Sequence, residues 1–304
     1  MREKRLLWVI FFNLIIVIGE IVFGLLANSF ALIADALHNG GDILAIVITY
    51  IAVKLEKRPT TFRWTFGFLR IEMMASFVNT MFLILTMFYL IYEAISKFSH
   101  VEKIEPIYMV IVGTIAIVAN GLSAYLLKGI SSCPHHHHDH NHHHEEDANI
   151  YSAYLHMLAD ALISVGVVVA GIVIYFYNIY YLDSVLTVIF SIYIILHSYP
   201  LLKRSFLALI DANRFYLSEE KLGDTILKDG RIVEFHDLHI YQPSSKHNFI
   251  SFHVVLDRDD YLLKECEEIV RNLKSKLRDL GFTHILIEVD SISNRSDEVF
   301  CSHV

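Results

Sequence analysis

Charged residues are scarce in this chain of 304 residues. Asp, Glu, Lys and Arg together make up 19% of it, hydrophobic residues make up 54%, and the mean hydropathy is +0.45. An average soluble domain is about 45–50% apolar and about 25% charged. The composition therefore argues against a disordered, fibrous or ordinary soluble protein.

Basic residues and cysteines are also few. The 25 Lys and Arg residues are outnumbered by 33 Asp and Glu residues, which argues against non-specific nucleic-acid binding because that binding depends on clustered positive charge. Cys133, Cys266 and Cys301 are too few and too scattered for a disulfide framework. Histidine is common by contrast, with 18 residues, and its clustering is the first sign of chemistry.

Long apolar runs dominate the first two thirds of the chain. A helix that spans a bilayer needs about 20 apolar residues. Six segments qualify: residues 6–26, 31–53, 71–95, 106–127, 150–175 and 182–202. The first is too long for the core of a signal peptide, and no small-residue cleavage site follows it. We therefore predict an α-helical membrane protein with six transmembrane helices in residues 1–210.

Residues 211–304 have the mixed, charged composition of a small soluble domain. Helices are expected at 218–228, with Ser218 as N-cap, and at 261–280, where Gly281 ends the helix. Strands are expected at 232–240, 249–256 and 283–289. The resulting αββαβ order predicts a C-terminal α+β domain.

The loops between the expected spans differ in charge. Basic residues gather at the N-terminus, in the loop at 54–70 and after the last span: Arg2, Lys4, Arg5, Lys54, Lys57, Arg58, Arg63, Arg70, Lys203, Arg204 and Arg214. The opposite loops hold only Lys97 and Lys103. The positive-inside rule then places both termini, the loop at 128–148 and the C-terminal domain in the cytoplasm of a multi-pass protein of the cell or inner membrane.

Two of the expected spans carry the same ionisable pattern, His-x-x-x-Asp. It occurs as His38 with Asp42 and as His156 with Asp160. Residues four apart share one face of a helix, so two such faces would present two imidazoles and two carboxylates. That set suits tetrahedral Zn²⁺, and a titratable imidazole can exchange a proton for a metal ion. Two unrelated helix–helix hydrogen-bonding pairs are the alternative, which the repetition disfavours because such residues are rare in lipid.

Other polar residues also fall inside the expected spans. Asn13, Glu20 and Asn120 either line the same cavity and support the metal ligands, or form helix–helix hydrogen bonds. The pattern leaves both open. Asp35 lies three residues before His38 and is placed to orient it. Asp183 is expected to cap the last span, with a role in proton release as the alternative.

A histidine-rich tract lies between the fourth and fifth spans. Its imidazoles are His135, His136, His137, His138, His140, His142, His143 and His144. This composition is typical of metal-binding tracts. It has no fixed coordination spacing, so we expect loose, exchangeable binding that gathers or buffers metal beside the entrance.

The segments around the two His-x-x-x-Asp motifs resemble the cation diffusion facilitator family. They read SFALIADALHNGGD at 29–42 and YLHMLADALISVG at 154–166. The likeness extends over nearly the whole chain and is greatest to zinc, cobalt and cadmium exporters with a His-rich loop. It implies a homodimeric metal/proton antiporter that moves Zn²⁺ out of the cytosol by alternating access; Cd²⁺ and Co²⁺ are not separated from Zn²⁺ by ligand type. His38, Asp42, His156 and Asp160 match the family's transport ligands one for one.

The resemblance also implies a second metal site in the C-terminal domain, where Zn²⁺ would act as a regulatory ligand on a metallochaperone-like fold. His236, His253 and Asp290 match three of the family's ligands there. Glu288 stands where many bacterial members have His. The alternative is that these are polar residues on the surface of the strands.

One further pair comes from the resemblance alone. Arg70 aligns with a basic residue that, in a family member, locks against an acid after the last span, and Asp211 is the matching acid. A dimer-locking Arg70–Asp211 pair is therefore expected. The loop at 60–70 offers no good metal ligand, so no metal is expected there.

Three other functions compete with antiport. A ZIP-type importer shares the His-Asn-x-x-Asp element, but importers of that family usually have eight spans and no large C-terminal domain. An intramembrane metallohydrolase needs an open metal position and a general base, whereas four ligands already close the tetrahedron and no His-Glu-x-x-His occurs. A metal sensor would need an effector motif, and none is visible. We therefore predict a transporter and not an enzyme.

Overall fold

The computed structural model describes residues 2–56, 58–99, 103–131, 143–296 and 299–300. Side chains are described in these ranges except at 2–12, 46, 49, 52–53, 56, 99, 123–131 and 143–159. The chain divides into two compact units, Met1–Val47 with Asn79–Pro200 and Ile48–Val78 with Leu201–Val304. The ends of three long helices thus group with the C-terminal domain.

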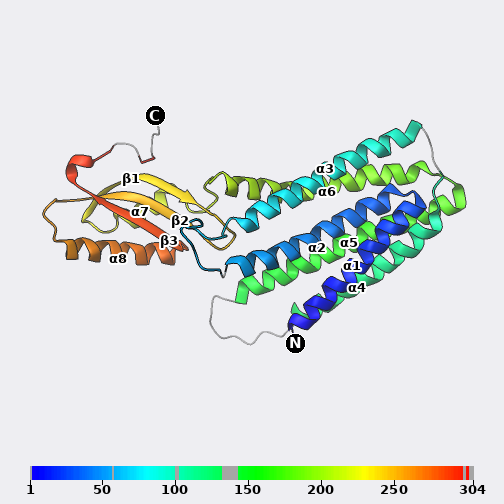
Figure 1. Ribbon diagram of the computed structural model, residues 1–304, viewed down its shortest axis with the longest axis horizontal. Helices are drawn as coiled ribbons and strands as arrows, with labels where there is room; N and C mark the ends of the chain where they lie inside the picture. Colours follow the sequence, from blue (N-terminus) through cyan, green and yellow to red (C-terminus); the bar gives the residue numbers. More distant parts are fainter. Residues whose placement is uncertain (1, 57, 100–102, 132–142, 297–298, 301–304) are drawn as a thin grey trace. The chain divides into compact units, whose positions relative to one another are not determined.

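Six long helices form the first two thirds of the chain (Figure 1). They are α1 (Arg2–Ala27), α2 (Phe30–Glu56), α3 (Ile71–Ser99), α4 (Pro106–Ser131), α5 (His143–Tyr177) and α6 (Tyr181–Leu209). Each predicted span lies within one of them. Among the described residues, three stretches are long and apolar enough to cross a membrane, Ile71–Phe98, Asp160–Tyr177 and Tyr181–Leu209, while Asn13–Ala27 and Pro106–Leu122 are shorter apolar stretches.

Close packing between α4 and α5 depends on glycine. A Cβ at Gly113 would lie 2.7 Å from Val168 Cγ2, and one at Gly171 would lie 3.1 Å from Met109 Cβ. Small residues at helix contacts let two backbones approach, which is how helices associate in membranes. The outer faces of the helices are apolar, as lipid requires. Leu196, for example, is 69% exposed.

The turn between α1 and α2 is held by a carboxylate from α6. Asp183 is fully buried. Its Oδ1 accepts a hydrogen bond from Ser29 Oγ at 2.5 Å, and its Oδ2 accepts one from Phe30 N at 2.9 Å. Ala31 N donates to Oδ1 at 3.3 Å. The expectation was that Asp183 would cap its own helix; instead it satisfies the free N–H groups at the start of α2, where a negative charge is favoured.

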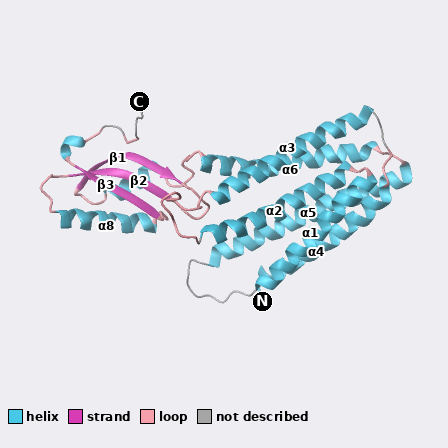
Figure 2. Cartoon of the chain, viewed as in Figure 1, coloured by secondary structure: helices cyan, strands magenta, loops and turns pink. Residues whose placement is uncertain are grey.

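The C-terminal domain contains the elements predicted for it (Figure 2). They are α7 (Glu219–Leu227), β1 (Ile232–Tyr241), β2 (Phe249–Leu256), α8 (Leu263–Asp279), β3 (His284–Asp290) and the 3₁₀ turn η1 (Ile292–Asn294). Ser218 is the N-cap of α7, and its side chain accepts a hydrogen bond from Lys221 N. Gly281 follows α8 with φ +102°, a backbone conformation that favours glycine.

The sheet order is β1-β2-β3, with β1 and β2 antiparallel and β2 and β3 parallel. The core of the domain includes Ile250, Phe252 and Val254 of β2 together with Ile226 of α7 and Leu273 of α8. Side chains alternate between the two faces of a strand. The intervening position 253 of β2 is therefore on the opposite face, which the core does not cover.

Candidate metal centres

The first centre lies between α2 and α5. His38 Nε2 lies 3.7 Å from Asp42 Oδ2 and 3.5 Å from Asp160 Oδ1. In a tetrahedral site with ligands about 2.0–2.2 Å from Zn²⁺, the ligand atoms are about 3.3–3.6 Å apart. His38 Nε2 is therefore close to this spacing from one carboxylate of α2 and one of α5. Among the described residues, the three ligand atoms do not all lie within 4.8 Å of one another, as those of the C-terminal domain do.

The fourth predicted ligand, His156, has its backbone in α5, one turn before Asp160. Its side chain lies outside the described residues. So do the side chains of the histidine tract: residues 135–142 fall in an undescribed segment, and only the backbones of His143 and His144 are described, in α5.

The exposure of the three described ligands differs. The side chains of His38 and Asp160 are 4% and 5% exposed, whereas that of Asp42 is 39% exposed. Two ligands are therefore in a low-dielectric environment and the third is open to solvent.

Several buried polar residues lie near the predicted ligands. Asp35, three residues before His38, accepts a hydrogen bond from Ser164 Oγ of α5 at 3.1 Å. Glu20 of α1 accepts one from Asn39 Nδ2 at 3.3 Å. Within the part of the chain whose side chains are described, Oε1 of Glu20, Oδ1 of Asp35 and Nδ2 of Asn120 have no hydrogen-bond partner. Each of the two carboxyls is thus held by one hydrogen bond, from Asn39 of α2 or from Ser164 of α5.

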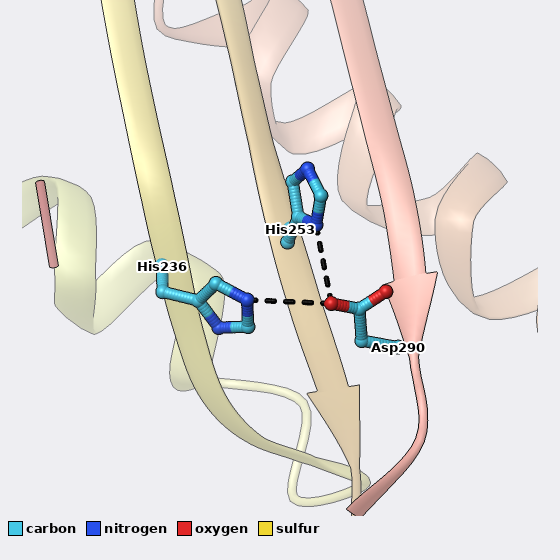
Figure 3. A group of neighbouring side chains, drawn as sticks. All are labelled: His236, His253 and Asp290. Atoms are coloured by element: carbon cyan, nitrogen blue, oxygen red, sulfur yellow. Dashed lines mark hydrogen bonds and ion pairs between the residues drawn. The ribbon is translucent and has the colours of Figure 1, made fainter. Parts of the chain in front are cut away.

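The second centre is on the face of the C-terminal sheet opposite Ile250, Phe252 and Val254. His236 and His253 are directly opposite each other in the antiparallel β1–β2 pair. His236 Nε2 and His253 Nδ1 lie 3.3 Å and 3.1 Å from the same oxygen, Asp290 Oδ2. Figure 3 shows both imidazoles directed at this carboxylate, and the three ligand atoms lie within 4.8 Å of one another.

The fourth residue predicted for this centre is more peripheral. Glu288 Oε2 lies 3.6 Å from His253 Nε2, and the Glu288 side chain is 66% exposed. The structure adds two carboxylates that the sequence did not indicate. Glu234 Oε1 lies 3.4 Å from His236 Nδ1, and Asp237 Oδ2 lies 3.5 Å from His253 Nε2.

Of these two additional carboxylates, one was predictable from the sequence and the other was not. Glu234 is two residues before His236, so period-2 alternation places both on one face, and this signal was available. Asp237 was not predictable, because it lies where the β1–β2 register shifts between His236 and His239 and has φ +54°. An irregularity of this kind redirects a side chain away from simple alternation.

Glu234 is held as a carboxylate. Burial raises the pKa of Glu234, but hydrogen bonds from Ser296 N at 2.8 Å and Arg295 Nε at 3.1 Å outweigh it. The net pKa therefore lies below the ordinary value for Glu. A carboxylate beside a ligating imidazole fixes its ring orientation and increases its basicity.

The predicted Arg70–Asp211 pair forms within one chain. Arg70 Nη2 lies 2.7 Å from Asp211 Oδ1 and 2.9 Å from Oδ2. Next to it, Glu72 in the first turn of α3 accepts a hydrogen bond from Ser245 Oγ at 2.8 Å. These two contacts tie the start of α3 to the segment after α6 and to the β1–β2 turn.

Comparison with known proteins matches both parts of the chain. Residues 6–210 match the cation efflux transmembrane domain, and residues 217–292 match the cytoplasmic domain of cation efflux proteins. A cadmium, cobalt and zinc/H⁺-K⁺ antiporter of Bacillus velezensis is 31% identical over 91% of this chain and 85% of its own length. The zinc transporter ZitB of Pectobacterium atrosepticum is 30% identical over 99% and 89%. The metal cation efflux protein CzcD of Cupriavidus metallidurans is 29% identical over 90% and 82%.

Proposed function

This chain belongs to the cation efflux family, and we propose that it exports Zn²⁺ from the cytosol in exchange for protons. The family consists of multi-pass membrane transporters and not enzymes, and relatives of this chain are named as antiporters of zinc, cadmium and cobalt. The proposed transport site is formed by His38, Asp42, His156 and Asp160. Zn²⁺ is the proposed substrate, with Cd²⁺ and Co²⁺ as related ones.

One observation carries the proposal. His38 Nε2 and Asp160 Oδ1, from two different helices, lie 3.5 Å apart and are almost completely buried. Ionisable side chains at this depth are costly and in membrane proteins mark ion pathways. A bound divalent cation offsets that cost by neutralising the carboxylates.

The proposed mechanism exchanges metal for protons at these residues. Zn²⁺ enters from the cytoplasm, first contacts the half-exposed Asp42 and displaces protons from His38 and His156. The helices then rearrange so that the site opens to the other side. Protons return to the imidazoles and release the metal. The histidine tract at 128–148 supplies metal near the entrance.

The C-terminal domain is proposed to regulate and to dimerise. His236, His253 and Asp290 would hold one Zn²⁺, with Glu234, Asp237 and Glu288 available as further oxygens. The matched cytoplasmic domain supports a homodimer. We propose that both termini are cytoplasmic and that the Arg70–Asp211 pair stabilises the dimer-competent arrangement.

The decisive experiment is zinc flux in reconstituted proteoliposomes with an imposed pH gradient. Wild type is compared with Asp160→Ala and with Asp224→Ala, an exposed carboxylate on α7. We expect flux that follows the opposing proton gradient, a loss of more than about tenfold in Asp160→Ala, and no loss in Asp224→Ala. Flux that survives in Asp160→Ala would place the pathway elsewhere. Tight zinc binding without flux would indicate a sensor.

A further inference from the structure

One buried carboxyl group beside the transport site has no role as a zinc ligand. Glu20 of α1 is fully buried. Its Oε2 accepts a long hydrogen bond from Asn39 Nδ2, and its Oε1 has no hydrogen-bond partner among the described residues. An ionised carboxylate in such an environment is costly, and a buried acid avoids that cost by binding a proton.

Among the described side chains, those around Glu20 do not compensate a negative charge. Asp35 of α2 and Asp160 of α5 interact with it electrostatically, and both are carboxyls; the side chains of α5 before Asp160 lie outside the described residues. α4 also packs against α1, and the buried polar residue in its described part is the neutral amide Asn120. On α2, His38 directly precedes Asn39 and is itself close to Asp42 and Asp160. Repulsion between carboxyls favours a proton on one of them.

A second buried carboxyl group in the same unit shows that burial alone does not decide the protonation state. Asp183 is as buried as Glu20, but it accepts hydrogen bonds from Ser29 Oγ and from the N–H groups of Phe30 and Ala31. These donors, at the positive end of α2, are arranged for a negative charge. Glu20 accepts a hydrogen bond from one neutral amide, that of Asn39, and not from such a set of donors.

We propose that Glu20 is a proton-binding site of the transport cycle, protonated when the metal site is empty and ionised when Zn²⁺ occupies it. This inference rests on the proposed function. The arriving Zn²⁺ carries two positive charges, and the field of the ion stabilises the Glu20 carboxylate, so the proton leaves its oxygen for solvent. When the metal departs, the uncompensated carboxylate takes a proton from the opposite side. Glu20 thereby adds a proton to those exchanged on the imidazoles.

The test counts the protons released for each Zn²⁺ bound. Calorimetric titration of the full-length protein with Zn²⁺, repeated in buffers of different ionisation enthalpy, measures this number directly. We expect Glu20→Gln to release about one proton fewer per bound Zn²⁺ than wild type. Asp183→Asn, the matched control, is expected to release the wild-type number. An unchanged number in Glu20→Gln would overturn the proposal.

A second measurement uses the wild-type protein, so its result does not depend on whether the Glu20→Gln variant folds. Infrared difference spectra of wild type, recorded as Zn²⁺ is added, should show loss of the C=O stretch of a protonated carboxylic acid and gain of carboxylate bands. A wild-type spectrum without that loss would overturn the proposal. Flux that survives in Asp160→Ala would overturn the proposed function, and with it the premise of this inference. Wild-type flux and zinc binding combined with an unchanged proton count would overturn only the role of Glu20.

Discussion

The two candidate metal centres of this protein use the same types of side chain on two different scaffolds. In the membrane centre, His38 and Asp42 are four residues apart on one helix, and Asp160 comes from a second helix. In the C-terminal centre, His236, His253 and Asp290 come from three different strands. A helix brings ligands together through local spacing, whereas a sheet does so through register. The first kind of site is therefore visible in a short segment of sequence, and the second is not.

The centres also differ in how their charges are compensated. Two of the three described ligands in the membrane centre are nearly excluded from solvent. In the C-terminal centre, His253 is 28% and Glu288 is 66% exposed, so water is available to replace a lost ligand. Loss of one partner from a buried charged set leaves an uncompensated charge. Substitutions should therefore be more damaging in the membrane centre.

The largest effect is expected from His38→Ala. This imidazole lies close to both described carboxylates of the membrane centre, so its removal takes away the nitrogen ligand that the two carboxylates share. Zn²⁺ affinity at that centre should fall on the order of 100-fold, since four ligands share the binding free energy of a zinc site. Competition with a fluorescent chelator measures the change. The control is His197→Ala, an imidazole of α6 that stacks on Tyr193; equal losses in both variants would contradict the assignment.

In the C-terminal centre, two carboxylates of β3 should differ in how much they contribute to zinc affinity. Asp290 Oδ2 is shared by both imidazoles, whereas Glu288 lies 3.6 Å from His253 and is largely exposed. We expect Asp290→Ala to weaken zinc binding at this centre by about 10–100-fold and Glu288→Ala by less than about threefold. Zinc titration in an Asp160→Ala background removes the contribution of the membrane centre, and both variants keep the same histidine tract. A reversed order would mean that Glu288 is the principal oxygen ligand.

The next prediction concerns Asp183, which caps the start of α2 at a distance from the proposed metal ligands. Asp183→Ala removes the carboxylate that satisfies the start of α2, the helix that carries His38. Loss of a helix cap costs about 1–2 kcal/mol, and the detergent-solubilised protein should unfold at a lower temperature. Ser191→Ala is a suitable control, because Ser191 is buried on α6 like Asp183, and its hydroxyl has no hydrogen-bond partner among the described residues. Equal destabilisation by the two variants would argue against the cap.

The smallest effect is expected at the Arg70–Asp211 pair. Both side chains are nearly half exposed, and exposed ion pairs contribute about 0–1 kcal/mol. Reversing either charge should weaken transport and dimerisation, and exchanging the two residues should partly restore them. Flux and the dimer fraction by light scattering report the effect. If the exchange restores neither, the pair has no locking role.

Much of the architecture was predictable because it depends on local patterns. The six apolar runs fall within six helices, and the order and approximate bounds of the C-terminal elements are those expected. The resemblance to the cation diffusion facilitator family is confirmed by the two matched domains. The i, i+4 spacing of His38 and Asp42 is sufficient to predict that both lie on one face of α2, because it does not depend on how the helices pack.

Tertiary structure decided the contacts that no local pattern contains. It brought Asp160 of α5 to 3.5 Å from His38, and it directed Asp183 to the start of α2 and not to its own helix. An irregularity in β1 placed Asp237 beside His253. The sequence alone determined which residue types share a helix face or alternate along a strand, because backbone periodicity sets both. Only packing between segments decided which charges meet, and whether a buried carboxyl such as Glu20 finds donors, because those distances depend on how separate elements come together.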